Sequence, residues 1–402
     1  MTKSTAQRIL HTLGEHHDEM IDLLTRCARL ESPSQVPESQ QAIIELLAKK
    51  LSDVGFRCRH LAGKTTGGQL LAIPRERQRG TPKQLLLGHC DTVWPTGTLE
   101  KMPVQSRDGR LHGPGVYDMK GGLVQAIFAI QAIRELRLTP QVTPVFFINS
   151  DEEIGSPESA SHIVRLAKIV NRAFVMEPSL GPEGQLKTAR KGVGRFVIRV
   201  LGKAAHAGLD PEKGISAILE LSHVVQTLFA LNDPERGTTV NVGTIDGGMR
   251  PNVIAPESRA EVDVRVQTQR DADAIHQAIY AMEPTVPGTE LEISGHIGRP
   301  PLERTPRNRV LWRHAIDAAE ALGFDIAEGS AGGGSDGNWT SLHTATLDGL
   351  GAVGDGAHAL TEHVLQERMP ARAALLACLM LREPVTTDAT EAEFPHRATA
   401  ED

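Results

Sequence analysis

The stretch Leu86-Leu87-Gly88-His89-Cys90-Asp91 is an apolar run that ends in a histidine and an acid. A second apolar run, residues 142–148, is followed by Asp151-Glu152-Glu153, and a third, residues 172–176, by Glu177. In an open α/β sheet, ligands collect at the carboxyl ends of the strands. We therefore predict that these histidine and carboxylate side chains share one rim of a sheet, where they would suit a divalent metal ion, zinc above all.

The order of apolar segments indicates an α/β fold with a mostly parallel sheet. Strands are expected at residues 84–87, 142–148, 172–176 and 345–347, and helices at residues 39–56, 121–138, 308–322 and 370–381. Helical segments show apolar residues three or four apart, whereas the buried strands are short continuous apolar runs. Strands that alternate with helices are typical of βαβ units.

The pattern changes near Lys191, which indicates an inserted domain. Residues 196–201, 239–244 and 259–266 alternate apolar and polar side chains, as half-exposed antiparallel strands do. Amphipathic helices are expected at residues 215–231 and 271–282. We predict a small α+β domain at residues 191–304, inserted between the two parts of a catalytic domain at 1–190 and 305–402, the latter with a polar tail from Glu383.

Composition restricts the partners and the location. The 402 residues exceed what one core usually organises, and 40% of them are hydrophobic, as in ordinary globular proteins. The net charge of -7 and the lack of a lysine- or arginine-rich run argue against a nucleic-acid partner. No apolar stretch approaches the roughly 20 residues that span a bilayer. Four scattered cysteines suit a reducing, cytoplasmic location.

Each candidate metal ligand could also have a purely structural role. His89 and Asp91 are two residues apart, so an extended segment would place both side chains on one side, where Asp91 could orient the imidazole. Asp118, in a glycine-rich loop before a helix, could simply cap that helix. Glu152 and Glu153 could be solvated, but adjacent residues at a strand end face different sides, so one could bind a metal while the other faces substrate. Their recurrence at successive strand ends favours a site.

Taken together, the motifs resemble the M20 family of zinc metallopeptidases, which includes glutamate carboxypeptidase, acetylornithine deacetylase and aminoacylase. The matching segments run through nearly the whole chain in the family's order. They are Gly88-His89-Cys90-Asp91, Gly113-Pro114-Gly115 with Asp118-Met119-Lys120-Gly121-Gly122, Asp151-Glu152-Glu153, Met176-Glu177-Pro178, His206-Ala207-Gly208, Pro251-Asn252-Val253-Ile254, Gly332-Gly333-Gly334-Ser335-Asp336, and Gly356-Ala357-His358 with Glu362. The glutamate carboxypeptidase-like branch is the most similar.

The resemblance implies two zinc ions per chain, although mixed histidine and carboxylate sites also accept Mn²⁺ or Co²⁺. Asp118 would bridge the two ions, Asp91 would orient a histidine ligand, and Glu152 would be the general base. The remaining metal ligands implied are His89 and Glu177 for one ion and Glu153 and His358 for the other. His358 is preferred to His343 and His363 because it follows a glycine-rich turn and precedes Glu362 by four positions; at His363 the family often carries tyrosine.

The inserted domain would be the family's lid and dimerisation domain. Its His206 would stabilise the oxyanion, reaching the partner subunit's site, and its Asn252 would contact substrate. Arg265, on the polar side of a predicted strand, could grip a substrate carboxylate with two hydrogen bonds. The alternative for Arg265 is an ion pair with Glu261 or Asp263 on the same face.

The sequence therefore predicts a metal-dependent exopeptidase that cleaves an amide bond next to a free carboxylate and releases a C-terminal amino acid. Its substrate would be a small peptide or an N-acyl amino acid. The near alternative is a deacylase of the acetylornithine or succinyl-diaminopimelate type. Two further alternatives are a non-catalytic zinc-binding scaffold and a nucleotide-binding oxidoreductase, the second resting only on the glycine-rich loop.

Overall fold

A computed structural model describes residues 2–76 and 80–386 of the chain. The chain divides into two compact units. Unit 1 comprises Met1–Thr188, Arg304–Ser330 and Ser335–Asp402, and unit 2 comprises Ala189–Glu303 with Ala331–Gly334. Most of the polar tail predicted from Glu383 onward lies outside the described residues.

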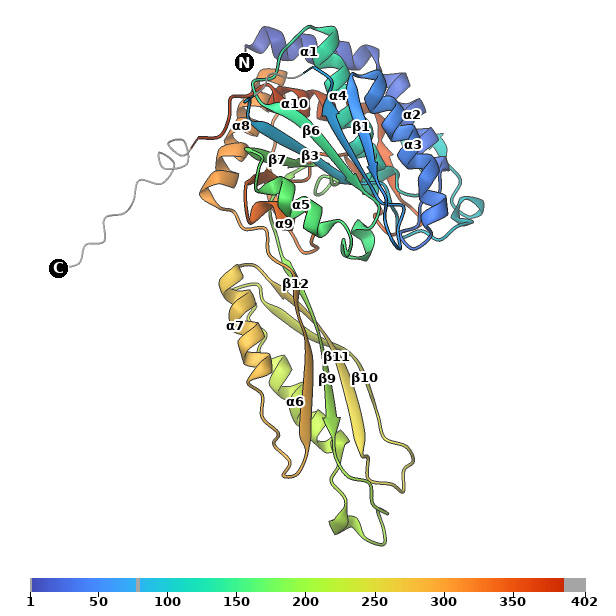
Figure 1. The fold of residues 1–402 in the computed structure, drawn as a ribbon, viewed down its shortest axis with the longest axis vertical. Coiled ribbons are helices and arrows are strands. Elements are labelled where there is room, and N and C mark those ends of the chain that lie inside the picture. Colours follow the sequence, from blue (N-terminus) through green and yellow to red (C-terminus); the bar gives the residue numbers. More distant parts are fainter. Residues whose placement is uncertain (1, 77–79, 387–402) are drawn as a thin grey trace, which may run out of the picture. The chain divides into compact units, whose positions relative to one another are not determined.

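A six-stranded sheet forms the centre of unit 1 (Figure 1). Its strands, in spatial order, are β1 (Phe56–Leu61), β2 (Gln69–Pro74), β6 (Thr143–Asn149), β3 (Lys83–His89), β7 (Arg172–Val175) and β14 (Ala345–Leu347). The strand β3 runs parallel to β6 and β7, and β14 runs parallel to β7, whereas β1 and β2 are antiparallel additions at one edge. The predicted α/β fold with a largely parallel sheet is confirmed, and the strands β1 and β2 were not predicted.

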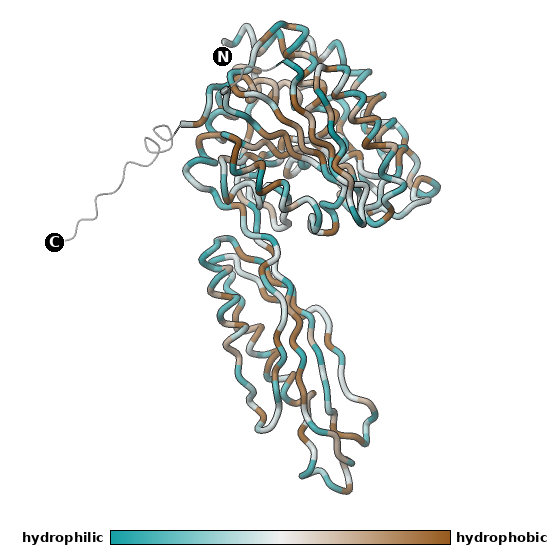
Figure 2. Tube along the Cα trace, in the orientation of Figure 1, coloured by the Kyte–Doolittle hydropathy of each residue, from teal (hydrophilic) through white to brown (hydrophobic). Residues whose placement is uncertain are grey.

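Both faces of this sheet are covered, which explains why its strands read as continuous apolar runs. On β3, Leu86 belongs to the core on one face, while Leu85 and Leu87 belong to the core on the other. The strand β6 divides in the same way between Phe146 and Phe147. Figure 2 shows these central strands as largely hydrophobic.

Helices form the two outer layers of unit 1. The larger core includes side chains of α1 (Lys3–Glu15), α2 (His17–Arg29), α3 (Pro37–Asp53), α4 (Gly121–Glu135), α8 (Pro306–Leu322) and α10 (Met369–Met380). The smaller core, on the opposite face, includes side chains of α5 (Ala160–Ala167) and α9 (Gly337–Ser341). The helices α4 and α10 are buried around most of their circumference, so they lack the polar face of a surface helix.

A second, smaller sheet brings two distant segments of unit 1 together. Its order is β15 (Gly354–Asp355), β16 (His363–Leu365), β5 (Arg110–His112) and β4 (Gln105–Arg107). The turn that contains Asp118 follows β5, and the loop that contains His358 lies between β15 and β16. The pairing of β16 with β5 therefore places the two loops side by side. A separate ladder pairs β8 (Leu186–Arg190) with β13 (Glu328–Ala331).

Unit 2 is an antiparallel sheet with helices packed on it. The strand order is β10 (Thr239–Gly247), β11 (Glu257–Val266), β9 (Gly192–Leu201) and β12 (Glu290–Arg299), and the helices are α6 (Ala217–Ala230) and α7 (Gln269–Tyr280). On β9, Phe196, Ile198 and Val200 are buried in a core shared with both helices, while the intervening residues are more exposed. This alternation is what the sequence pattern predicted; the fourth strand, β12, was not predicted.

Gly122 provides a test of how tightly α4 packs against the end of β7. A Cβ atom at Gly122 would lie 1.9 Å from the carbonyl oxygen of Met176, so the helix and the strand end would have to separate. We expect Gly122→Ala to lower the free energy of unfolding by about 1–3 kcal/mol, as overpacking does. Denaturant titration measures this change.

Gly14 in α1 supplies the matched control, because a Cβ atom there would meet no other atom within 4 Å. We expect Gly14→Ala to be neutral or to stabilise the protein by about 0.5–1 kcal/mol, the usual helical preference for alanine. Equal stability of the two variants would contradict the tight contact at Gly122.

Candidate metal centre

His89 is the last residue of β3, and its side chain is buried. Its Nδ1 atom lies 3.1 Å from the carbonyl oxygen of Asp91 and 3.3 Å from the Oδ1 atom of the same residue. In the neutral ring, a proton on Nδ1 would be shared with Asp91, and Nε2 would keep its lone pair. This is the arrangement by which proteins usually orient a metal-binding histidine.

The carboxylate of Asp118 lies between two histidines. Its Oδ1 atom is 3.3 Å from Nε2 of His89, and its Oδ2 atom is 3.5 Å from Nε2 of His358. Asp118 belongs to the turn Val116–Lys120 that opens α4, and its peptide bond to Met119 is cis. Because each oxygen faces a different histidine, Asp118 has the geometry of a ligand that bridges two ions.

Two glutamates extend the cluster on either side of Asp118. The Oε1 atom of Glu177 lies 3.5 Å from Nε2 of His89, and the Oε2 atom of Glu153 lies 3.1 Å from Nε2 of His358. Glu177 follows β7, whereas Glu153 lies in the turn after β6. The five predicted ligands therefore form two groups that share Asp118.

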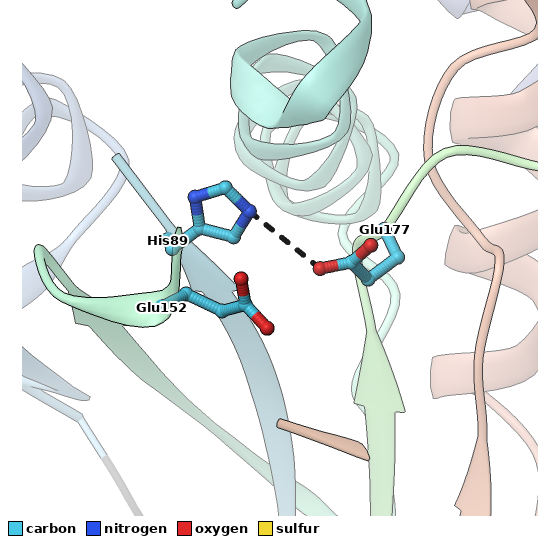
Figure 3. Close-up of side chains that lie close together, drawn as sticks. All are labelled: His89, Glu152 and Glu177. Atoms are coloured by element: carbon cyan, nitrogen blue, oxygen red, sulfur yellow. Dashed lines mark ion pairs between the residues drawn. The ribbon is translucent and has the colours of Figure 1, made fainter. Parts of the chain in front are cut away.

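Glu152 lies beside the first group. Potential ligand atoms of His89, Glu152 and Glu177 all lie within 4.8 Å of one another, as do those of His89, Asp118 and Glu153. Figure 3 shows the carboxylate of Glu152 directed into the space next to His89 and Glu177. Geometry alone is thus compatible with Glu152 as a neighbour of the metal or as a ligand.

The donor set fits divalent metal ions. Within the described residues, three buried side-chain atoms of the cluster make no hydrogen bond: Nε2 of His89, Oδ1 of Asp118 and Oε1 of Glu153. Leaving such atoms buried and unsatisfied is costly. Imidazole nitrogen and carboxylate oxygen are ligands of Zn²⁺ and related ions, which would satisfy all three atoms at once.

The electrostatics of the cluster also favour a cation. Contacts with Asp118 and Glu153 raise the pKa of His358 to about 10. Burial acts to raise the pKa of Asp118, but contacts with His358 and His89 outweigh it and lower that pKa. A proton on these imidazoles thus occupies the place that a metal cation takes, and metal binding would release it.

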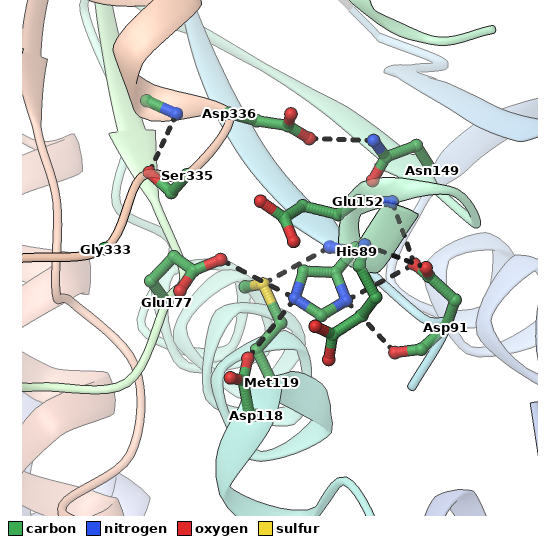
Figure 4. A network of polar contacts seen from close by, with 12 residues as sticks. His89, Asp91, Asp118, Met119, Asn149, Glu152, Glu177, Gly333, Ser335 and Asp336 are labelled. Atoms are coloured by element: carbon green, nitrogen blue, oxygen red, sulfur yellow. Dashed lines mark hydrogen bonds and ion pairs between the residues drawn. The ribbon is translucent and has the colours of Figure 1, made fainter. Parts of the chain in front are cut away.

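Asp91 contacts residues of both halves of the centre. Besides contacting His89, its buried carboxylate accepts hydrogen bonds from the backbone N–H groups of Glu152 (3.3 Å) and Glu153 (3.1 Å) and from Oγ of Ser34 (2.6 Å). Figure 4 shows this arrangement from close by. One side chain therefore orients a histidine and holds the turn that presents both glutamates.

Glu362 holds the backbone of the loop that carries Asp118. Its buried carboxylate accepts hydrogen bonds from the backbone N–H groups of Gly115, Tyr117 and Asp118, at 3.0–3.1 Å, and from Nε1 of Trp94 at 2.9 Å. Burial raises the pKa of Glu362, although these donors act in the opposite direction. The sequence identified Glu362 only as part of a motif; its hold on the Asp118 loop emerges from the structure.

Asp336 supports the turn after β6 in a way that the sequence did not predict. Its Oδ2 atom accepts a hydrogen bond of 2.7 Å from Nδ2 of Asn149, and its Oδ1 atom accepts one from Oγ of Ser156. Asn149 and Ser156 flank the segment that carries Glu152 and Glu153, and Figure 4 shows the contact between Asn149 and Asp336. The Gly-Gly-Gly-Ser-Asp motif thus contributes a buried carboxylate that fixes this segment.

His358 is the histidine that meets the cluster. Its backbone φ angle of 61° is in the left-handed region, which non-glycine residues adopt infrequently and often at functional sites. His363 instead lies against His112, and His343 is exposed.

The three predicted substrate residues all lie in unit 2. His206 and Asn252 are close in space, since the N–H of Ala207 donates a hydrogen bond to the carbonyl oxygen of Asn252 at 3.1 Å. Arg265 forms a two-bond ion pair with Asp263, at 2.7 and 2.9 Å, which is one of the alternatives that the sequence offered. The substrate roles of all three residues stay predictions.

A comparison with protein-family models decides the family. Residues 85–382 match the model of peptidase family M20/M25/M40, which covers well over half of the chain. The chain belongs to this family. The predicted M20 membership is thereby confirmed.

Relatives of this M20 peptidase include several hydrolases. Carboxypeptidase G2 of Pseudomonas sp. (strain RS-16) is 26% identical over 369 residues, which are 90% of this chain and 88% of that protein. A succinyl-diaminopimelate desuccinylase of Thioalkalivibrio sulfidiphilus is 25% identical, over 90% of this chain and 99% of that protein. An acetylornithine deacetylase of Pasteurella multocida is 32% identical, over 57% of this chain and 62% of that protein.

Solved structures share the fold. Aminopeptidase PepT from Bacillus cereus superposes with a TM-score of 0.75 at 22% identity, covering 90% of this M20 peptidase and 98% of PepT. The YXEP protein of Bacillus subtilis, described as a dinuclear metal binding peptidase of family M20, has a TM-score of 0.68 at 16% identity, covering 92% and 98%.

The M20 peptidase is therefore a hydrolase of the metallopeptidase and amidohydrolase group, which confirms the enzyme prediction over the scaffold and oxidoreductase alternatives. The described residues contain groups that could hold a metal ion. None of the described helices has both the length and the apolar character that crossing a membrane requires.

The hydrogen bonds of Glu362 lead to a prediction about metal affinity. Glu362→Ala would leave the N–H groups of Gly115, Tyr117 and Asp118 without their acceptor, so the Asp118 loop would lose its position. We expect a loss of about 10–100-fold in metal affinity, as for other residues that orient metal ligands. Equilibrium dialysis against a metal buffer measures this loss.

Glu367→Ala is the matched control, because Glu367 is an exposed glutamate five residues further along. It should bind metal like the unaltered protein. If Glu362→Ala also retained full metal affinity, the proposed hold on the Asp118 loop would be wrong.

Proposed function

We propose that this protein cleaves the amide bond next to a free carboxylate in a small peptide or N-acyl amino acid, with two zinc ions bound at the candidate centre. The observation that supports this most directly is the bridging geometry of Asp118 between His89 and His358. Mn²⁺ or Co²⁺ could replace zinc, since the ligand set is mixed.

The proposed ligand sets follow the two groups of side chains. His89 and Glu177 would hold one ion, Glu153 and His358 would hold the other, and Asp118 would bind both. When bound, a pair of ions supplies Lewis acidity, which activates water and polarises a substrate carbonyl. Asp91 and Glu362 would keep this geometry from relaxing, because they fix the loops that carry the ligands.

Glu152 is the proposed general base. Its backbone N–H is held by Asp91, and its carboxylate lies next to the ligand atoms of His89 and Glu177. In that position it could take a proton from the attacking water and deliver it to the leaving nitrogen. The adjacent Glu153 faces His358, so the two neighbours divide base and ligand roles between them.

His206 is the proposed oxyanion donor. Its Nδ1 atom accepts hydrogen bonds from the N–H groups of Gly208 (3.1 Å) and Leu209 (3.2 Å). The ring proton of neutral His206 must therefore be on Nε2, which makes Nε2 a donor. A positioned donor of this kind stabilises developing oxyanion charge by roughly 3–4 kcal/mol.

One inserted domain cannot supply all three predicted substrate contacts to one small substrate. His206 and Asn252 belong to loops that adjoin the Glu257 end of β11, whereas Arg265 lies near the other end of that strand. The strand between Glu257 and Arg265 spans about 27 Å, at about 3.4 Å per residue. An extended dipeptide spans only about 7 Å. If all three residues bind substrate, two copies of the chain must cooperate.

We accordingly propose a homodimer formed through unit 2. The strand β10 is at an edge of its sheet, and such an edge can pair with another chain. Large apolar side chains are exposed on α6, on β10 and in adjoining loops: Leu209, Ile218, Leu219, Phe229, Ile245 and Met249. Ile218, Leu219 and Met249 line one surface hollow, and grouped apolar exposure of this kind is typical of protein interfaces. His206 of one copy would then act at the centre of the other.

The substrate class rests on the relatives. Similarity to a carboxypeptidase, carboxypeptidase G2, supports release of a C-terminal amino acid by this protein, whereas similarity to the desuccinylase and the deacetylase supports the deacylase alternative. The predicted absence of nucleic-acid and membrane partners stays a prediction. A cytoplasmic location is also proposed, since all four cysteines are unpaired.

Hydrolysis of a panel of N-acyl amino acids and dipeptides tests the proposed function. We expect zinc-loaded protein to cleave members with a free carboxylate next to the amide, and Glu152→Gln to reduce kcat by about 10²–10⁴-fold with bound metal unchanged. The amide of glutamine keeps the shape of Glu152 but cannot accept the proton. Full activity in Glu152→Gln, or no activity of the metal-loaded protein on any member, would reject the proposal.

A mixing experiment tests the action of His206 across the dimer. Glu152→Gln and His206→Ala are each expected to be nearly inactive. When equal amounts of the two variants are dissociated and reassociated together, half of the dimers would contain one chain of each variant. One of the two sites in such a mixed dimer would be intact, so about a quarter of the activity of the unaltered protein should return. No recovery, despite mixed dimers being present, would place His206 at the site of its own chain.

A further inference from the structure

Two histidines outside the candidate centre face each other on the small sheet of unit 1. In the register of this sheet, His363 of β16 is paired with His112 of β5, and Asp355 of β15 is paired with His363. Directly paired residues on antiparallel strands project to the same face, with Cβ atoms about 4.5–5.5 Å apart. Asp355, His363 and His112 therefore form one row across three strands.

The separation of the two rings suits a shared ion. The ring centroids of His112 and His363 are 5.2 Å apart, and the planes are tilted by 35°. Two nitrogens bound to one tetrahedral zinc ion, each at about 2.0–2.1 Å, lie roughly 3.3–3.4 Å from each other. The observed separation of the rings is compatible with one nitrogen of each binding the same ion.

His363 is already oriented as a ligand. Its Nδ1 atom lies 3.0 Å from the carbonyl oxygen of Thr361, to which it can donate its proton. The Nε2 atom then keeps its lone pair. A backbone carbonyl that accepts from the second ring nitrogen is the usual partner of a metal-binding histidine.

His112 is suited to remain neutral, as a ligand must. Burial lowers its pKa, and the neighbouring His363, Arg107 and Arg110 lower it further, while Asp108 acts in the opposite direction. The two arginines also repel a cation, but both side chains are exposed, Arg107 on β4 and Arg110 on β5, where salt screens such effects. Asp355, which is exposed and paired with His363, adds a negative charge to the row, and its Oδ1 atom accepts a hydrogen bond of 2.7 Å from the N–H of Gly356.

We propose that His112 and His363 form an additional transition-metal site, typified by Zn²⁺, with water completing its coordination. The ion would join β5 to β16. This site shares no side chain with the centre around Asp118, so it does not depend on the proposed reaction.

The proposed site adjoins the two chain segments that position Asp118 in the candidate centre. His112 is followed by the loop that contains Gly115 and Asp118, and His363 is preceded by Glu362, which accepts hydrogen bonds from both. An ion between His112 and His363 would fix the two chain segments whose contact holds Asp118 in place. Zinc at this site would therefore stabilise the loop beyond what the hydrogen bonds of Glu362 achieve.

Zinc binding to the full-length protein tests the proposal. Equilibrium dialysis at neutral pH should give one more zinc ion per chain for the unaltered protein than for His363→Phe or His112→Phe. Phenylalanine keeps an aromatic ring in the row and removes the nitrogens. The comparison is a difference of one ion, so it requires no catalytic activity.

His343→Phe is the control, because His343 is an exposed histidine outside the row, and it should bind as much zinc as the unaltered protein. Zinc added beyond saturation of the centre should also raise the Tm of the unaltered protein and of His343→Phe, but not that of His363→Phe. Equal zinc content in all four proteins would overturn the proposal. So would a Tm of the unaltered protein that does not respond to the added zinc.

Discussion

The position of one half-buried carboxylate, that of Asp118 between two histidines, is the constraint on which the candidate centre depends. Each of its oxygens faces a different imidazole, so a displacement of the side chain would affect both halves of the cluster. The turn that carries Asp118 has no regular helical or strand geometry of its own. Its backbone is instead held by Glu362, from a segment more than 240 positions away in sequence.

Buried acids around the centre act mainly by holding backbone N–H groups. Asp91 holds those of Glu152 and Glu153, Glu362 holds that of Asp118, and Asp336 binds side chains on both sides of the Glu152 turn. Burying charge in this way is costly unless every oxygen has partners. The hydrogen bonds supply those partners, and they convert loops into rigid supports for the ligands.

The sheets of the two units differ in how their faces are covered. In unit 1, helices cover both faces, and the polar side chains of the centre follow strand ends, where the sheet can no longer bury them. In unit 2, one face of the sheet packs on helices, and its edge strand β10 and helix α6 expose apolar side chains. The length of β11 separates His206 and Asn252 from Arg265. If all three residues bind one substrate, the proposed chemistry therefore requires the proposed dimer.

Sequence periodicity was sufficient for most of the fold. The continuous runs of β3 and β6 predicted a sheet covered on both faces, and the alternation in β9 and β11 predicted a half-exposed sheet, because side-chain burial follows directly from strand geometry. The strands β1, β2 and β12 were missed. Most residues of β1 and all residues of β12 are half-buried or exposed, and only three of the six residues of β2 are buried, so the hydrophobic pattern of these strands is weak.

The sequence by itself determined which residue types are available at the strand ends, and its motifs named the candidate ligands, Glu152 and the family. Only the tertiary structure decided their distances, the two-sided position of Asp118, and the roles of Glu362 and Asp336. It also set the pairing of His112 with His363, which are 251 positions apart, across two strands. The physical reason is that local sequence specifies burial and backbone preference, whereas contacts between distant segments depend on how the strands pair and the loops pack.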